Sequence, residues 1–408
     1  MANRRLLYVV NFYGTPPLNF LSKYLAENTD YHLTVLKLPA MSPAKNGMSY
    51  EAFLINENGH KEYVRFLLPL KVPPVLTLLL QYVFNLYAAF KLVSKKGTFD
   101  LAVGETSFGS AVVRWYKILG RVKKTVFMSG DVLPIFEGKI KPYYLHSENA
   151  VIQAMDKLFI FVQLALRKIG MTNDVVWYAS EKTREWDLEN NIKAKAYFTA
   201  PAVTIDKNEA LCHLETAKTE NILAYFGRLD QYAGVDVSLE ALALIRKELP
   251  EARLVLVGGS ETAVNKYRAL AKDLGVEQYV DFKGFVEKTE DALALISQAK
   301  LGLALYKPDK ENVSLYADVS KPKEYLRAGL PVVMSHGGPY LGIELETLGA
   351  AVLTDFSPVE IAKTCVAVLQ NTEKYQKLLK GVGNAAHKYD YRENFRMVVA
   401  KIEELTKH

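Results

Sequence analysis

Apolar residues in this chain fall into short runs separated by segments of helical periodicity, a pattern typical of α/β proteins. In the first half, the runs predict strands at residues 6–10, 33–36, 101–103, 125–128, 175–179 and 195–198. The periodic segments between them predict helices at 18–27, 75–95, 107–120 and 152–169. Because strands alternate with helices, we expect a parallel, doubly wound sheet.

A polar, irregular stretch at 201–221 is the best candidate for a linker. The alternation then restarts, with strands predicted at 222–226, 253–257, 280–283, 301–305, 332–335 and 351–353. Helices are predicted at 236–248, 263–274, 291–299, 321–328 and 358–370, and an amphipathic helix at 391–407. We therefore expect a Rossmann-like domain at 1–205, a second one at 206–385, and a C-terminal helix at 386–408 that packs back toward the first domain.

Composition supports a folded, two-domain protein. The hydrophobic fraction of 50% and the charged fraction of 24% are those of a folded protein. The chain has 408 residues, and a single hydrophobic core rarely organises a chain of that length. Two cysteines, Cys212 and Cys365, cannot form a disulfide framework, and no Cys/His cluster has metal-ligand spacing. The apolar run at 6–10 is too short for a secretory signal. We expect a cytoplasmic location.

The net charge of +6 suggests a polyanionic partner. No long basic run exists, and aromatic residues do not alternate with Lys and Arg as they do on single-strand binding surfaces. Nucleic acid is therefore excluded as a partner. Phosphorylated small molecules and an anionic membrane surface remain.

The most informative stretch is residues 320–333, which places Lys321 three positions before Glu324 at the start of a predicted helix. Residues three apart share one helix face, and a helix start offers free backbone N–H groups to an anion. This pattern suits a ligand that carries both phosphates and hydroxyls. Glu324 would accept hydrogen bonds from ribose hydroxyls; alternatively, it is a surface carboxylate paired with Lys323 or Arg327.

Glycines and a second cation follow other predicted strands of the same domain. Gly227 and Arg228 come directly after the strand at 222–226, at the edge where open α/β sheets bind ligands. A guanidinium matches phosphate oxygens, although a surface salt bridge explains Arg228 equally well. Gly258 and Gly259 after the next strand permit close approach of the backbone to a ligand.

In the first domain, Gly14 follows the first predicted strand, in a position that corresponds to that of Gly258 and Gly259 in the second domain. The chain contains no G-x-G-x-x-G, no Walker lysine and no Asp-x-Asp pair. These absences disfavour dehydrogenases, P-loop enzymes and a metal–diphosphate site, so no metal is predicted.

At residues 226–229, 254–259, 282–286 and 321–333 the chain resembles the retaining GT-B glycosyltransferases of the group-1 (family 4) type. The resemblance implies two Rossmann-like domains facing a cleft, a nucleotide-sugar co-substrate and no other cofactor. It also implies that Arg228 and Lys321 stabilise the leaving nucleoside diphosphate and that Glu324 binds the ribose. Fixed cations would then replace a metal ion.

Three positions depart from the family pattern. Tyr316 stands where a glutamate usually contacts the donor sugar, Ala233 where a lysine follows the Gly-Arg-Leu, and Glu105 where a histidine is common. Asp318 or Glu311 could supply the missing acid.

Glu105 and Asp131 follow two first-domain strands. Either carboxylate could orient the acceptor or stabilise positive charge in the transition state. Alternatively, each is a loop carboxylate that caps a helix.

Residues 72–90 carry no charge, although a membrane span here would separate the first strands from their sheet. Thr77, Gln81 and Asn85 form one polar stripe, which fits either a core helix or a helix lying in a lipid interface beside Lys91 and Lys95. Residues 158–166, followed by Arg167 and Lys168, repeat this apolar-then-basic pattern.

We therefore expect a peripheral enzyme on the inner face of the cell membrane, with a lipid-linked or polysaccharide acceptor. The alternatives are a GT-B transferase with a soluble small-molecule acceptor and a non-catalytic nucleotide-binding relic of the fold.

Overall fold

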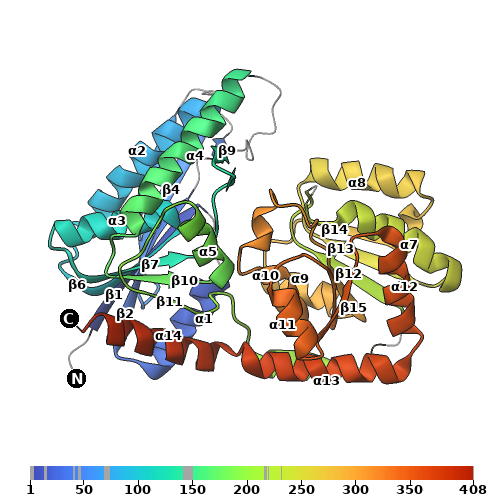
Figure 1. Cartoon of the computed structure of the whole chain (residues 1–408). Helices are drawn as coiled ribbons and strands as arrows, with labels where there is room; N and C mark the ends of the chain where they lie inside the picture. Colours follow the sequence, from blue (N-terminus) through green and yellow to red (C-terminus); the bar gives the residue numbers. More distant parts are fainter. Residues whose placement is uncertain are drawn as a thin grey trace. The chain divides into compact units, whose positions relative to one another are not determined.

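The computed structural model describes residues 4–12, 16–39, 42–44, 47–68, 74–140, 150–215, 218, 220–230 and 232–407. Its contacts divide the chain into two compact units (Figure 1). Unit 1 comprises residues 1–202 and 394–408, and unit 2 comprises residues 203–393.

Unit 1 is built on a sheet with strand order β11-β10-β7-β6-β1-β2-β4-β3, with β5 paired to β4. Its strands are β1 (Arg4–Phe12), β2 (Tyr31–Pro39), β3 (Ser42–Ala44), β4 (Gly47–Ile55), β5 (Lys61–Leu68), β6 (Phe99–Glu105), β7 (Val122–Ser129), β10 (Val175–Tyr178) and β11 (Tyr197–Thr199). A separate short hairpin pairs β8 (Ile135–Phe136) with β9 (Lys139–Ile140). Its helices are α1 (Pro16–Asn28), α2 (Pro74–Val93), α3 (Thr106–Ile118), α4 (Ala150–Gly170), α5 (Glu181–Glu189) and most of α14 (Tyr391–Leu405).

Alternating side chains bury both faces of this sheet. Leu7 and Val9 pack with residues of α2 and α3. Leu6, one position away, faces α1 and α14 together with Leu101 and Trp177. Period-two alternation thus sends each strand's side chains to two separate helix layers.

The hairpin β4–β5 was not predicted. It pairs Met48 with Leu68 through Ile55 with Lys61, antiparallel, and β4 joins β2 antiparallel as well. The turn closes where Gly59, with φ of +73°, donates its N–H to the carbonyl of Asn56. The prediction of a wholly parallel first sheet is therefore wrong at this edge, although the doubly wound parallel core from β11 to β2 is confirmed.

Unit 2 contains a parallel sheet with strand order β14-β13-β12-β15-β16-β17. Its strands are β12 (Ile222–Phe226), β13 (Arg253–Val257), β14 (Val280–Gly284), β15 (Leu301–Ala304), β16 (Val332–Ser335) and β17 (Ala351–Thr354). Its helices are α6 (Lys207–Leu214), α7 (Val235–Glu248), α8 (Glu261–Asp273), α9 (Thr289–Ile296), α10 (Ser320–Arg327), α11 (Leu341–Thr347), α12 (Pro358–Leu369) and α13 (Thr372–Lys388), with 3₁₀ turns η1 (Glu277–Tyr279) and η2 (Val313–Leu315).

Two cores sandwich this sheet. Ala224 and Val255 pack with α9 and α10 on one face, whereas Leu223 and Leu254 pack with α7 and α12 on the other. The predicted linker at 201–221 is not a simple linker, because α6 lies inside it and packs on α10 and α13. Among the helices of the described residues, none combines the length and apolarity needed to cross a bilayer.

Candidate functional site

Two neighbouring strands of unit 2 end in glycines at the carboxyl edge of the sheet. Phe226 pairs with Val257, so Gly227 and Gly258 leave β12 and β13 side by side. Their φ angles are +122° and +124°, in the region that favours glycine. A Cβ on Gly258 would lie 2.0 Å from the carbonyl oxygen of Gly227, so position 258 has no room for a side chain.

Gly259 continues this turn, with φ of +81°. A Cβ there would lie 2.5 Å from side-chain atoms of Leu229. Protein atoms fill the space beside both glycines, so these two tight turns form only with glycine at positions 258 and 259.

Lys321, in the first turn of α10, lies against this edge. Its Cε is 3.4 Å from the place a Cβ on Gly227 would take, and the residue is only 8% exposed. Its Nζ lies 4.0 Å from the ring centroid of Tyr225 and 5.4 Å from that of Tyr306. Among the described residues, Nζ has no hydrogen-bond partner. The ammonium is therefore held by aromatic faces without an acceptor.

The electrostatics of Lys321 follow from this burial. Desolvation lowers its pKa to about 7, the carboxylate of Asp230 opposes that change, and the guanidinium of Arg228 adds to it. Arg228 is thus near enough to Lys321 to repel it. An anion bound between the two cations would relieve the repulsion and favour the charged lysine.

Arg228 itself is 70% exposed at the side chain, and its Nη2 lies 3.5 Å from a carboxylate oxygen of Asp230. The surface ion pair that we considered for this residue is therefore present. A pair this exposed contributes little stability, so it does not prevent Arg228 from turning to a phosphate.

Glu324 lies one turn along α10 from Lys321 and is 6% exposed. Its Oε2 has no hydrogen-bond partner among the described residues and lies 3.5 Å from Nη1 of Arg327. Burial raises the pKa of Glu324, and Arg327 counteracts this. The alternative pairing with Lys323 is wrong, because Lys323 pairs with Asp318 and donates to the carbonyl of Val203.

That contact also settles the suggestion that Asp318 replaces the missing acid. Its carboxylate pairs with the buried Lys323 and accepts the N–H of Val203 at 2.9 Å. Asp318 is therefore a structural residue. Tyr316 follows η2, and its hydroxyl donates to the carbonyl of Lys310 at 3.3 Å; a donor-sugar role for Tyr316 or Glu311 stays a prediction.

In unit 1, Glu105 ends β6 and is 4% exposed. Although it is the N-cap residue of α3, its side chain makes no capping hydrogen bond, so the helix-cap alternative is wrong. Its Oε2 accepts from the buried hydroxyl of Tyr8 at 3.3 Å. The next residue, Thr106, has φ of +65°, a conformation that side chains rarely adopt and that is often kept at functional sites.

Asp131 follows β7 and precedes β8, so it caps no helix. Its carbonyl accepts from Arg167 at 3.0 Å, and Arg167 also donates to Ser129 and pairs with the buried Asp187. This network fixes the loop that carries Asp131. Gly14, the remaining predicted residue, lies outside the described residues.

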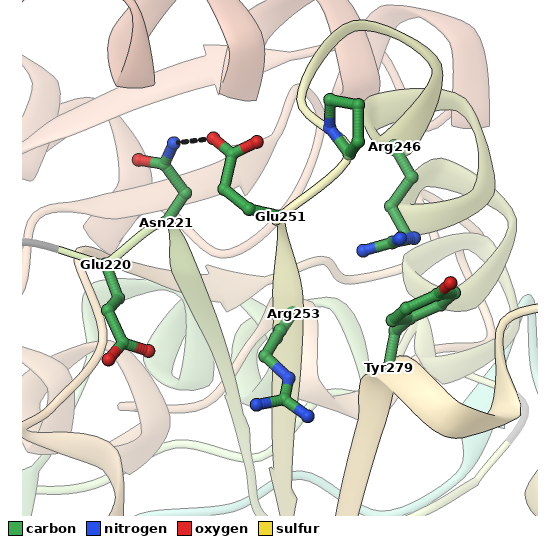
Figure 2. A pocket seen from close by; sticks show the side chains of 7 residues that line it. Glu220, Asn221, Arg246, Glu251, Arg253 and Tyr279 are labelled. Carbon is green, nitrogen blue, oxygen red and sulfur yellow. Dashed lines mark hydrogen bonds between the residues drawn. The ribbon is translucent and has the colours of Figure 1, made fainter.

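A hollow of the unit 2 surface lies away from this edge. A surface pocket of about 560 Å³ lies at the opposite, amino edge of the unit 2 sheet. It is lined by Glu220, Asn221, Arg246, Pro250, Glu251, Arg253 and Tyr279 (Figure 2). None of the predicted site residues belongs to it, and its Arg246 already donates to the carbonyl of Ala252, so the carboxyl edge is the better candidate.

Reasoning from the sequence missed the surroundings of Lys321. In the sequence, Tyr225 is an ordinary aromatic residue of a predicted buried strand. Tyr306 lies one position after the end of another predicted strand. Asp230 had a weak signal, two positions after Arg228. Only the packing of α10 against β12 brings these side chains together.

Solved structures share this fold over their whole length. HepE of Anabaena in complex with UDP is 15% identical, covers 98% of this chain and 100% of its own, and has a TM-score of 0.60. Sucrose-phosphate synthase of Thermosynechococcus elongatus is 16% identical, with 98% of each chain covered and a TM-score of 0.67. WaaG, a glycosyltransferase involved in lipopolysaccharide biosynthesis, is 13% identical, covers 99% of this chain and 100% of its own, and has a TM-score of 0.59. A comparison with curated protein sequences found no match.

These likenesses define the fold as GT-B, as predicted. Residues 206–382 further match the family model described as glycosyl transferases group 1. The chain therefore carries a group 1 glycosyltransferase domain, and the resemblance drawn from its motifs is confirmed for this domain.

Proposed function

We propose that this protein is a retaining glycosyltransferase that moves a sugar from a nucleotide-sugar donor to an acceptor hydroxyl. The observation that carries the proposal is the buried Lys321 ammonium, without an acceptor among the described residues, beside the glycine turns at Gly227 and Gly258. An isolated buried cation costs free energy that a bound anion would return. A diphosphate is the anion that a group 1 domain would hold there.

In the reaction, the sugar leaves the diphosphate through an oxocarbenium-like state, and the acceptor hydroxyl attacks from the same face. Lys321 and Arg228 would stabilise the developing charge on the diphosphate in place of a metal ion. Glu324 would hold the ribose. Glu105 and Asp131, from unit 1, would orient the acceptor or stabilise positive charge.

The donor is tested first. HepE has been solved with UDP and with UDP-glucose, so UDP and UDP-sugars head a thermal-shift screen that also includes GDP and ADP. Wild type should release nucleoside diphosphate slowly from the best donor, with EDTA present, and Lys321→Ala should not. Tight binding of donors that are never cleaved would instead favour the non-catalytic relic, which Tyr316 and Ala233 suggest.

A lipid-linked acceptor is favoured by an unusual orientation of α2. Its polar stripe faces inward: Gln81 is 3% exposed and Asn85, which accepts from Tyr50 at 2.6 Å, is fully buried. Apolar side chains of the same helix face outward. The exposed ones are Val83, Leu86, Tyr87 and Phe90.

Helix α4 lies beside α2 (Figure 1) and exposes Leu158 and Phe161 as well. These exposed apolar side chains, with Lys91 and Lys95 at the end of α2, give the composition expected of a helix pair that rests on an anionic bilayer. Arg167, which we had counted among the basic residues, does not take part, because it is buried against Asp187.

Flotation with vesicles of phosphatidylcholine and phosphatidylglycerol tests this. Wild type should float, and Phe90→Asp and Phe161→Asp should not, with nucleotide binding unchanged. Phe285→Asp is the matched control, because Phe285 is 76% exposed but lies in unit 2. If wild type stays with the soluble fraction, the result would favour the alternative of a soluble small-molecule acceptor.

A further inference from the structure

One buried side chain contacts both parts of the anion site. Tyr225, in β12, is fully buried. Its hydroxyl lies 2.7 Å from the carbonyl oxygen of Arg228 and 3.1 Å from that of Ala233. These two carbonyls stand near the two ends of the loop between β12 and α7, so a single hydroxyl hydrogen, donated to one or shared by both, closes the loop that carries Arg228.

The ring of the same residue supports the second cation. Nζ of Lys321 is 4.0 Å from the ring centroid of Tyr225, within the range of a cation–π contact. Such contacts are strongest where water is excluded, as it is around this lysine. Arg228 and Lys321 come from different elements of the fold. Tyr225 contacts both the loop that carries Arg228 and the side chain of Lys321.

We propose that Tyr225 is a positioning residue that holds the Arg228 loop with its hydroxyl and the Lys321 ammonium with its ring, so that both cations meet one diphosphate. This inference rests on the proposed function. Burial raises the pKa of Tyr225 well above its ordinary value, so the hydroxyl stays a neutral donor at physiological pH.

A matched pair of substitutions isolates the hydroxyl. Tyr225→Phe removes the loop contact and keeps the ring under Lys321. Tyr375→Phe is the control, since Tyr375 lies in α13 of the same unit and its buried hydroxyl has no hydrogen-bond partner among the described residues.

Calorimetry measures the affinity for whichever of UDP, GDP and ADP binds wild type most tightly. Tyr225→Phe should weaken binding about tenfold, the order expected for one buried hydrogen bond. Tyr375→Phe should stay within about twofold. If wild type binds none of the three nucleotides, the proposed function itself fails, and the inference falls with it.

A double-mutant cycle separates positioning from simple destabilisation. In an Arg228→Ala background, Tyr225→Phe should cost less than about twofold, because the loop no longer carries a cation to position. A tenfold loss in both backgrounds, or no loss in either, overturns the proposal. A purely structural tyrosine would lower the melting temperature without this coupling.

If Tyr225→Phe does not fold, a near-isosteric probe replaces it. Tetrafluorotyrosine at position 225 depletes the ring face of electron density and so weakens the cation–π contact. Several-fold weaker nucleotide binding is expected; unchanged affinity overturns the role of the ring.

Discussion

Basic side chains lie at both edges of the unit 2 sheet, but their surroundings differ. At the amino edge, Arg246 donates to the carbonyl of Ala252 and stacks on Tyr279, and Arg253 shares an open pocket with two glutamates. At the carboxyl edge, Lys321 is buried beside Arg228 without an acceptor among the described residues. A pocket is present at the amino edge. From the comparison we infer that the buried cation without an acceptor, rather than the pocket, is the mark of an anion site.

The difference arises from what each edge gives its cations. At the amino edge, Arg246 donates to the carbonyl of Ala252 and stacks on Tyr279 (Figure 2), so a ligand there would have to displace an existing partner. The carboxyl edge instead offers glycine turns and aromatic faces, neither of which neutralises an ammonium. Substitutions at the carboxyl edge should therefore have large effects on stability or nucleotide binding, and substitutions at the amino edge should have small ones.

The largest expected effect comes from Gly258→Ala. The new Cβ would be 2.0 Å from a backbone oxygen and φ is +124°, so unfolding free energy should fall by at least about 3 kcal/mol. Gly275→Ala, with φ of +70° and open space around it, should cost only about 1 kcal/mol. Urea denaturation measures both, and equal losses would show that the turn at Gly258 is not tightly packed.

A pH titration comes next. With the pKa of free Lys321 near 7 and a higher value in the complex, nucleoside diphosphate binding takes up one proton above pH 7. Affinity should therefore fall about fiftyfold between pH 7 and 9, by calorimetry. The nucleotide's own phosphate titrates near pH 6 and does not contribute in that range.

The stability of the free protein depends on pH with the opposite sign. Because burial lowers the pKa of Lys321, the unfolded chain binds the extra proton between about pH 7 and 10, so this lysine makes the free protein more stable as pH rises. Lys321→Met should remove both dependences. Affinity that does not change with pH in wild type would contradict a lowered pKa of Lys321 in the free protein.

Glu324→Gln should have a smaller and more selective effect. If the carboxylate accepts from ribose hydroxyls, wild type should prefer a ribonucleoside diphosphate over its 2′-deoxy form about tenfold. The variant should bind the two forms nearly equally. If Glu324 serves only Arg327, the substitution would lower stability and leave the preference for ribose intact.

The smallest expected change is that of Asp230→Asn. Asp230 favours the charged form of Lys321 but is 30% exposed, so solvent screens it. Its removal should shift the midpoint of the affinity–pH curve downward by less than about one pH unit. An upward shift would mean that another group controls the titration.

Most of the unit 2 fold could be predicted, because most of its strands are short apolar runs, two of them followed directly by glycine, and its helices are periodic. Strands 222–226 and 253–257 match β12 and β13 residue for residue. The hairpin β4–β5 was missed although Asn58-Gly59 is a strong turn signal, since a charged, partly exposed pair of strands lacks long apolar runs.

Side-chain surroundings were less accessible from the sequence. Positions Lys321 and Glu324 could be selected by spacing, but that Asp318 is bound to Lys323 depends on the path of the chain near Val203. In the same way, Thr77, Gln81 and Asn85 revealed a stripe on α2 without revealing that Gln81 and Asn85 face inward. Periodicity gives the faces of a helix, and only packing says which face is covered.

One measurement tests the central claim most directly: the affinity for a nucleoside diphosphate at pH 7 of Lys321→Ala beside that of Arg253→Ala. Loss of the buried ammonium should weaken binding by at least about 100-fold, whereas loss of the amino-edge guanidinium should change it less than about twofold. Wild-type affinity in Lys321→Ala, or a larger loss in Arg253→Ala, would contradict the assignment of the diphosphate to the carboxyl edge.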